Sequence, residues 1–216
     1  MSDTERISKQ IIALMKTDSK PFYIKYTTFA GNIVKDFSRD IGYSSYEYFD
    51  TENRWVNRLD SDRLFRRIKF GISNDEIRKI IVLVVGEFTR NSRKHVTDII
   101  AEQAGKASGR IFINSILLQD MASYFTSKLL PKIIFNATFT LSVTIAGARA
   151  RSLYVSRKLK NKSPSLFYMM RKKDDLDLFY FLVDDCLEPF IDALSIKENN
   201  EEEFHEIIKN ILSGIN

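Results

Sequence analysis

The scarcity of glycine and proline is the feature that most restricts how this chain can fold. Its 216 residues include only 8 Gly and 4 Pro. Sheet-rich folds need frequent turns, and these two residues supply many of the backbone conformations that tight turns require. The 44% hydrophobic content is enough to build a buried core. We therefore predict an all-α fold, a compact multi-helix bundle of about seven to nine helices.

Local signals predict where several helices begin and end. Ser2 or Asp3 is expected to cap a first amphipathic helix, which ends near residues 18–21. Ser73 or Asn74 is expected to cap another helix, with acidic residues in its first turn. Pro164 is expected to open a short helix. Residues 174–194 have an amphipathic helical pattern, and a polar connector then leads to a last helix through Ile211.

The region before Gly71 is expected to form a helix with an apolar face directed into the core. We predict that this buried stripe consists of Trp55, Leu59, Leu64, Phe65 and Ile68. The domain organisation that we predict has an N-terminal helical lobe, residues 1–71, and a larger helical domain, residues 72–216. Residues 135–145 alternate apolar and polar side chains like a strand, but without a plausible partner strand we favour a buried helix.

A candidate helix-turn-helix lies in the N-terminal lobe, in the sequence KDFSRDIGYSSYEYF at residues 35–49. This motif needs apolar residues that hold two helices together, and here Phe37 and Ile41 supply them. It also needs a small residue where the helices approach and a glycine at the turn, where the backbone adopts positive φ. Ser38 and Gly42 have the expected spacing for these two positions.

The segment GYSSYEYF at residues 42–49 resembles the second half of the helix-turn-helix units in bacterial AraC-type regulators. A small N-terminal unit before a larger helical domain is also similar to the layout of TetR-type regulators. The resemblance implies DNA binding, with Ser44, Ser45, Tyr46 and Glu47 facing the major groove and with Arg39, Arg54 and Arg58 reaching phosphates. The alternative is an ordinary helix-turn-helix corner inside a helical core.

Positive charge is the next functional signal. The formal net charge is +5 and the pI is near 9.2, which favours acidic partners such as DNA or an anionic membrane but is also ordinary for a soluble protein. Arginine and lysine are concentrated in residues 54–69 and 149–162. Each basic stretch is a candidate for binding a polyanion, and a solvated helix face is the alternative.

Two weakly charged stretches, residues 111–127 and 133–148, are predicted to form a helical hairpin. A membrane span needs about 20 predominantly apolar residues. Asp120 interrupts the first stretch, and hydroxyl and amide side chains interrupt the second. We therefore favour a buried hairpin in a soluble bundle. The alternative is a membrane-active, pore-forming effector that inserts residues 111–148.

Signals for enzymatic activity are weak, and we predict no catalytic residues, no metal site and no cofactor. His95 and His205 occur in polar helical segments without companions at metal-ligand spacing, so we expect both on the surface. Among the acidic residues at positions 174–188, Asp184 and Glu188 are one helical turn apart and are retained as a candidate pair for a divalent cation. Asp174 and Asp175 are expected to complement a helix dipole.

These observations support three functional hypotheses. In the first, the chain is a non-enzymatic helical regulator that binds DNA through its N-terminal helix-turn-helix and dimerises or senses a ligand through its larger part. In the second, it binds a partner protein, as a bacterial immunity or effector-associated protein does, because 16 Phe and 9 Tyr are available for an interface. The third is the membrane-active effector.

We place DNA binding first because it alone depends on a residue pattern with a mechanism. An exposed aromatic patch would instead favour protein binding. The N-terminus has no apolar stretch typical of a secretory signal, and the single cysteine, Cys186, is expected to be a core residue in a reducing compartment. We therefore expect a cytoplasmic protein.

Overall fold

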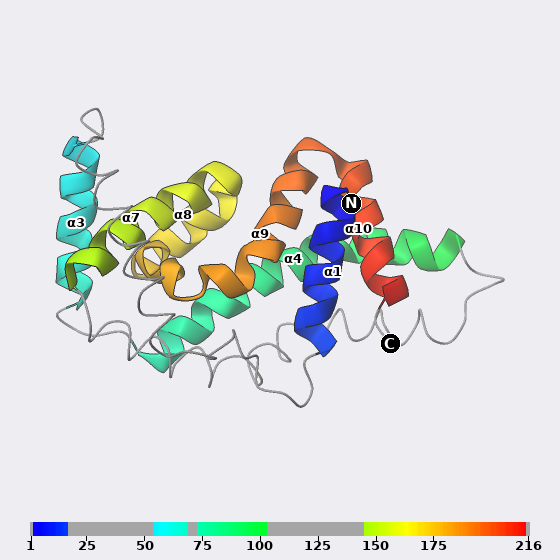
Figure 1. The fold of residues 1–216 in the computed structure, drawn as a ribbon, viewed down its shortest axis with the longest axis horizontal. Coiled ribbons are helices and arrows are strands. Elements are labelled where there is room, and N and C mark those ends of the chain that lie inside the picture. The colour runs from blue at the N-terminus through cyan, green and yellow to red at the C-terminus, as the bar shows by residue number, and fades with distance from the viewer. Residues whose placement is uncertain (1, 17–53, 69–72, 103–144, 215–216) are drawn as a thin grey trace. The chain divides into compact units, whose positions relative to one another are not determined.

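The computed structural model describes residues 2–16, 54–68, 73–102 and 145–214 of the chain (Figure 1). Within these ranges the chain is helical and contains no strand, so the predicted all-α fold is confirmed. The described ranges contain eight helices, which agrees with the predicted seven to nine. They are α1 (Asp3–Lys16), α3 (Arg54–Ile68), α4 (Asn74–Glu102), α7 (Ile145–Lys162), α8 (Pro164–Lys172), the 3-10 helix η2 (Leu176–Leu182), α9 (Asp184–Asn199) and α10 (Glu201–Gly214).

The predicted helix starts at α1, α4 and α8 are confirmed. At α1, the Ser2 hydroxyl accepts a hydrogen bond from the backbone N–H of Glu5 at 3.2 Å. At α4, the Ser73 hydroxyl accepts from the backbone N–H of Glu76 at 3.2 Å, and the Glu76 carboxylate accepts from the backbone N–H of Ser73 at 2.7 Å. This reciprocal pair is a capping box. Pro164 occupies the first turn of α8.

The C-terminal part of the chain differs from the prediction. Residues 174–194 do not form one helix. Asp174 and Asp175 adopt left-handed φ values of 60° and 57° and separate α8 from η2, and η2 ends at Leu182 before α9 begins at Asp184. The two aspartates were expected to complement a helix dipole; Asp175 is the residue before η2, which is a 3-10 helix and not an α-helix. The polar segment before the last helix is not a long connector either. It is helical up to Asn199, and the Asn200 side chain then caps α10 by accepting the backbone N–H of Glu203 at 3.2 Å.

One compact unit of the chain comprises Met1–Pro21, Ile81–Leu129 and Cys186–Asn216. Helix α1 packs against α10, and the Ser8 hydroxyl donates to the Ile207 carbonyl at 3.4 Å. The core of this unit contains Phe88 of α4. Its ring makes edge-to-face contacts with Phe190 and Phe204, at centroid distances of 5.2 and 6.0 Å. These aromatic contacts hold α9 and α10 on α4.

The second compact unit comprises Phe22–Ile80 and Leu130–Asp185. Helix α7 is its centre, since it packs against α3, α8 and η2 (Figure 1). The apolar side chains of η2 are buried, among them Leu178 and Phe179. The Ser152 hydroxyl of α7 donates to the Leu178 carbonyl at 2.5 Å and fixes η2 on α7.

Several predictions concern residues outside the described ranges. The candidate helix-turn-helix at residues 35–49 lies there, and so does the hairpin at residues 111–148 except for its end in α7. The division into residues 1–71 and 72–216 also stays a prediction, because its boundary falls outside the described residues. In the described part of the chain, no helix is both long enough and apolar enough to cross a membrane.

Candidate binding face of helix α3

Helix α3 exposes its large apolar side chains. Trp55 is 68% exposed, Leu59 is 46% exposed and Phe65 is 44% exposed, and Val56 is exposed beside them. The prediction that these residues form a buried stripe is therefore wrong for Trp55, Leu59 and Phe65. Leu64 alone is confirmed as a buried residue, while the side chain of Ile68 is not described. Val56 and Phe65 are nine positions apart, about 180° around the helix, so they lie at opposite edges of the exposed side. We call the surface of Trp55 and Leu59, with Val56 and Phe65 at its two edges, the α3 apolar face.

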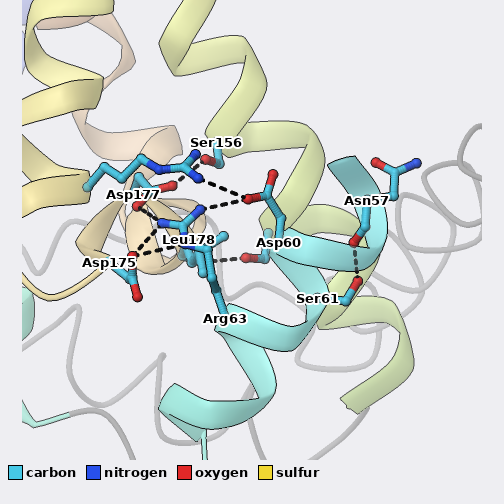
Figure 2. A network of polar contacts seen from close by, with 10 residues as sticks. Asn57, Asp60, Ser61, Arg63, Ser156, Asp175, Asp177 and Leu178 are labelled. Atoms are coloured by element: carbon cyan, nitrogen blue, oxygen red, sulfur yellow. Dashed lines mark hydrogen bonds and ion pairs between the residues drawn. The ribbon is translucent and has the colours of Figure 1, made fainter. Parts of the chain in front are cut away.

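The opposite side of α3 is polar and buried. It carries Asn57, Asp60, Ser61 and Arg63. Figure 2 shows the Arg63 guanidinium surrounded by three carboxylates. It lies 2.7 Å from an oxygen of each of Asp60, Asp175 and Asp177, and its Nε also donates to Asp175 at 2.9 Å. Burial of these charged groups is compatible with a stable fold only because they bind one another.

The partners of Arg63 come from α3 itself, from the turn before η2 and from η2. Asp60 is three residues earlier on α3, Asp175 immediately precedes η2, and Asp177 lies in the first turn of η2. The Ser156 hydroxyl of α7 donates to the second oxygen of Asp177 at 2.9 Å. Arg171 of α8 approaches Asp60 at 3.7 Å. Asp175, with its left-handed backbone, and Asp177 both pair with Arg63.

Electrostatics keep this cluster ionised. Burial by itself would lower the pKa of Arg63, but the charges and hydrogen bonds of Asp177, Asp175 and Asp60 outweigh it and raise the pKa. Burial raises the pKa of Asp177, and Arg63 and the Ser156 hydroxyl oppose that rise. With a guanidinium at hydrogen-bond distance, we take Asp177 to be a carboxylate at neutral pH. The cluster therefore holds α3 on η2 and α7 through charge-assisted hydrogen bonds.

A second inward arginine strengthens the attachment of α3. Arg67 forms an ion pair with Glu76 in the first turn of α4 and lies over the Phe179 ring, 5.9 Å from its centroid. Arg63 and Arg67 are therefore committed to internal ion pairs. The hypothesis that the basic stretch at residues 54–69 binds a polyanion is wrong for these two residues. Arg58 and Arg66 remain exposed on the outer side of the helix.

The second basic stretch also contributes to the interior. Arg151 is buried, lies 3.2 Å from Asp184 and stacks over Phe181 at 5.8 Å. Asp184 was retained as a candidate partner of Glu188 for a divalent cation, but it faces Arg151, whose charge repels cations. No group of three or more metal-binding side chains occurs among the described residues.

The residues predicted to bind DNA are only partly described. Arg39, Ser44, Ser45, Tyr46 and Glu47 lie outside the described residues. Arg54 is the first residue of α3, and its side chain is not described. Arg58 is exposed on the same side of α3 as Trp55 and Leu59. The described structure thus brings one predicted phosphate contact next to an apolar face that we did not predict.

The α3 apolar face has the composition of a protein-binding surface. Trp55 and Phe65 are separated by ten positions, about 15 Å along the helix axis. Tryptophan and arginine are enriched among the residues that contribute most to binding at interfaces. Contiguous exposed apolar patches rimmed by polar residues are typical of interaction sites.

One sequence signal could have shown that α3 is inverted, with its polar side buried and its large apolar side chains exposed. Asp177 is the single charged residue in the run LDLFYFL, which is otherwise apolar or aromatic. A lone carboxylate in such a run is expected to be buried and therefore to need a cationic partner.

Comparison of the chain with protein families, with curated proteins and with solved structures finds no match.

Proposed function

We propose that this chain is a non-enzymatic binding protein that captures a partner protein through the α3 apolar face. The observation that carries the proposal is the exposure of Trp55 next to Leu59 on a helix whose polar side is buried. Burying a tryptophan and its apolar neighbours on a partner is favourable by about 25 cal/mol for each Å² of apolar surface removed from water. In the free chain this apolar surface stays in contact with water.

The attachment of α3 makes its outer face suitable for binding. Arg63 and Arg67 hold the helix on η2 and α4 from within, so the exposed side chains are presented on a rigid element. A preorganised surface loses less conformational entropy on association than a mobile one. The ion-pair network thus supports function indirectly, by fixing the geometry of the face.

The charges beside the apolar face indicate the chemistry of the partner. Arg58 and Arg66 contribute two positive charges and Asp62 one negative charge, which leaves one net positive charge on the exposed side of α3. A partner with a complementary apolar groove or helix face and a mildly acidic rim fits this pattern. An immunity or effector-associated role is one setting in which such capture is used.

The test is site-specific photo-crosslinking from position 55. A photoreactive residue at Trp55 should capture one protein in cells of the source organism, and the same residue at Tyr168 of α8 should not. Tyr168 is a matched control because it is an exposed aromatic residue on another helix of the same unit. With the captured partner purified, Trp55→Ala should weaken binding by about 30-fold or more, as expected for a central aromatic contact. Equal capture at both positions would contradict the proposal.

DNA binding remains the second candidate, since Arg58 is exposed beside Trp55 and can contact phosphate. It makes a different prediction in the same experiment: position 55 would capture nucleic acid. Binding to a random-sequence duplex would then fall steeply with salt and would weaken in Arg54→Ala/Arg58→Ala. Crosslinks to lipid would point to the membrane hypothesis, and crosslinks between two copies of the chain would point to a homodimer.

A further inference from the structure

The two histidines of the chain contact each other in the first compact unit. His95 belongs to α4 and His205 to α10, and their Nδ1 atoms are 3.2 Å apart. We expected both residues on the surface. That expectation is wrong for His95, which is only 4% exposed and packs edge-on against Phe204 at 5.2 Å between ring centroids.

The contact between two Nδ1 atoms limits how many protons the pair can hold. A hydrogen bond at this distance needs one Nδ1–H donor and one Nδ1 lone pair. The neutral pair and the singly protonated pair both satisfy this requirement. A doubly protonated pair places two N–H groups and two positive charges against each other, so the closed structure excludes it.

The charged groups around His95 come from both helices. On α10, Glu201 has a carboxylate oxygen 3.7 Å from His95 Nε2. On α4, Lys94 lies 3.8 Å from the same oxygen, and Asp98 is also near. Burial and then His205 lower the pKa of His95, and Lys94 acts in the same direction, against Glu201 and Asp98.

We propose that the His95–His205 contact is an acid-sensitive latch that holds the start of α10 on α4 and opens when the second histidine binds a proton. Opening at this point exposes Phe204, which is buried next to His95 in the closed structure. Because the phenyl ring also packs on Phe88, its release disturbs the core that α4 shares with α10.

The direction of the pH dependence follows from proton counting. Above the ordinary histidine pKa of about 6.5, both the closed and the open pair are neutral and the latch is fully stable. Below it, the open pair binds two protons and the closed pair only one. The opening equilibrium therefore rises as the pH falls below that value, by a factor that approaches about ten for each further unit.

Histidine titration by NMR tests the latch directly, because the chain contributes only two histidine ring signals. In the presence of EDTA, only one ring should bind a proton while α10 stays on α4. In His205→Gln the charge of the second ring is absent, so the pKa of His95 should rise from its wild-type value, although burial still holds it low. Two independent titrations in the wild type, or an unchanged pKa of His95 in His205→Gln, would overturn the proposal.

Unfolding by urea at pH 7.5, 6.5 and 5.5 provides the second readout. From pH 6.5 to 5.5 the unfolding constant of the wild type should rise more than that of His205→Gln, by up to about fivefold. Glu206→Gln is the matched control, because it removes an exposed titratable group from the next position of α10 and should follow the wild type. Parallel pH dependence in the wild type and His205→Gln would exclude the latch.

Discussion

The guanidinium of Arg63 lies 2.7 Å from a carboxylate oxygen of Asp177, which is 114 positions further along the chain. This buried ion pair determines which side of α3 faces the interior. A helix with Trp55, Leu59 and Phe65 on one side would ordinarily bury them. Here the polar side is inside because η2 and the turn before it supply the carboxylates that Arg63 requires.

Removal of Arg63 should strongly destabilise the chain. Arg63→Met keeps much of the side-chain volume but leaves the buried Asp177 without its cation, and we expect a loss of about 3–5 kcal/mol in the free energy of unfolding. Urea denaturation followed by far-ultraviolet circular dichroism measures it. Arg58→Met on the exposed side of the same helix is the control and should change stability by less than about 0.5 kcal/mol. Equal effects would show that the ion pair does not hold α3.

Removal of both partners should be less harmful than the separate effects suggest. In Arg63→Met/Asp177→Leu no carboxylate is left in the fully buried position, so the double variant should be more stable than the sum of the two single losses predicts. We expect a coupling energy of about 0.5–3 kcal/mol from the double-mutant cycle. Additive losses would mean that Asp60 and Asp175, and not Asp177, are the main partners of Arg63.

Trp55 should contribute little to the stability of the free chain. Trp55→Ala is expected to change the free energy of unfolding by less than about 0.5 kcal/mol, whereas truncation of a core aromatic such as Phe88 costs about 3–5 kcal/mol. Trp55 is the only tryptophan, so iodide quenching of its fluorescence measures its exposure directly. Protection from iodide in the free chain would contradict the exposed position of this side chain.

Asp174 and Asp175 should respond in opposite directions to glycine. Both have left-handed φ values, which glycine adopts without the steric penalty of a β-carbon. Asp174→Gly should be neutral or stabilising by up to about 1 kcal/mol. Asp175→Gly relieves the same strain but removes a carboxylate that binds Arg63, and it should be destabilising. Thermal unfolding of the two variants side by side gives the comparison. An Asp175→Gly variant that is more stable than Asp174→Gly would contradict the role of Asp175 in binding Arg63.

The capping box at the start of α4 should be measurable by itself. Ser73→Ala removes the hydroxyl that accepts the Glu76 backbone N–H and should cost about 0.5–2 kcal/mol. Ser73→Thr retains a hydroxyl and Ser73→Gly is tolerated at this position, so both should lose much less. Urea denaturation of the three variants measures the series. An alanine variant as stable as the threonine variant would mean that the cap contributes nothing.

The helix starts could be predicted from the sequence because their causes are local. Ser73 and Glu76 are three residues apart, so the capping box is visible in the sequence itself. The burial of α3 could not be predicted in the same way. Its inner face is stabilised by residues more than 100 positions away, and a hydrophobic pattern contains no information about such a partner.

The histidine contact was missed for the same reason. His95 and His205 are 110 positions apart, and each one by itself occurs in a polar segment that is typical of a surface helix. Only the packing of α10 on α4 brings them together. Spacing rules detect sites formed within one helix or loop, whereas these two sites are formed between helices.

In helix α3, the residues required for folding and the residues proposed to bind the partner lie on opposite sides. In a mutational scan scored by abundance in the cell, substitutions at Arg63 should be depleted and those at Trp55 tolerated, although tryptophan is usually the less replaceable residue. A scan scored by capture of the partner should instead show intolerance at both positions. Positions that tolerate substitution in the abundance scan but not in the capture scan would then map the face that natural selection has maintained for the partner and not for the fold.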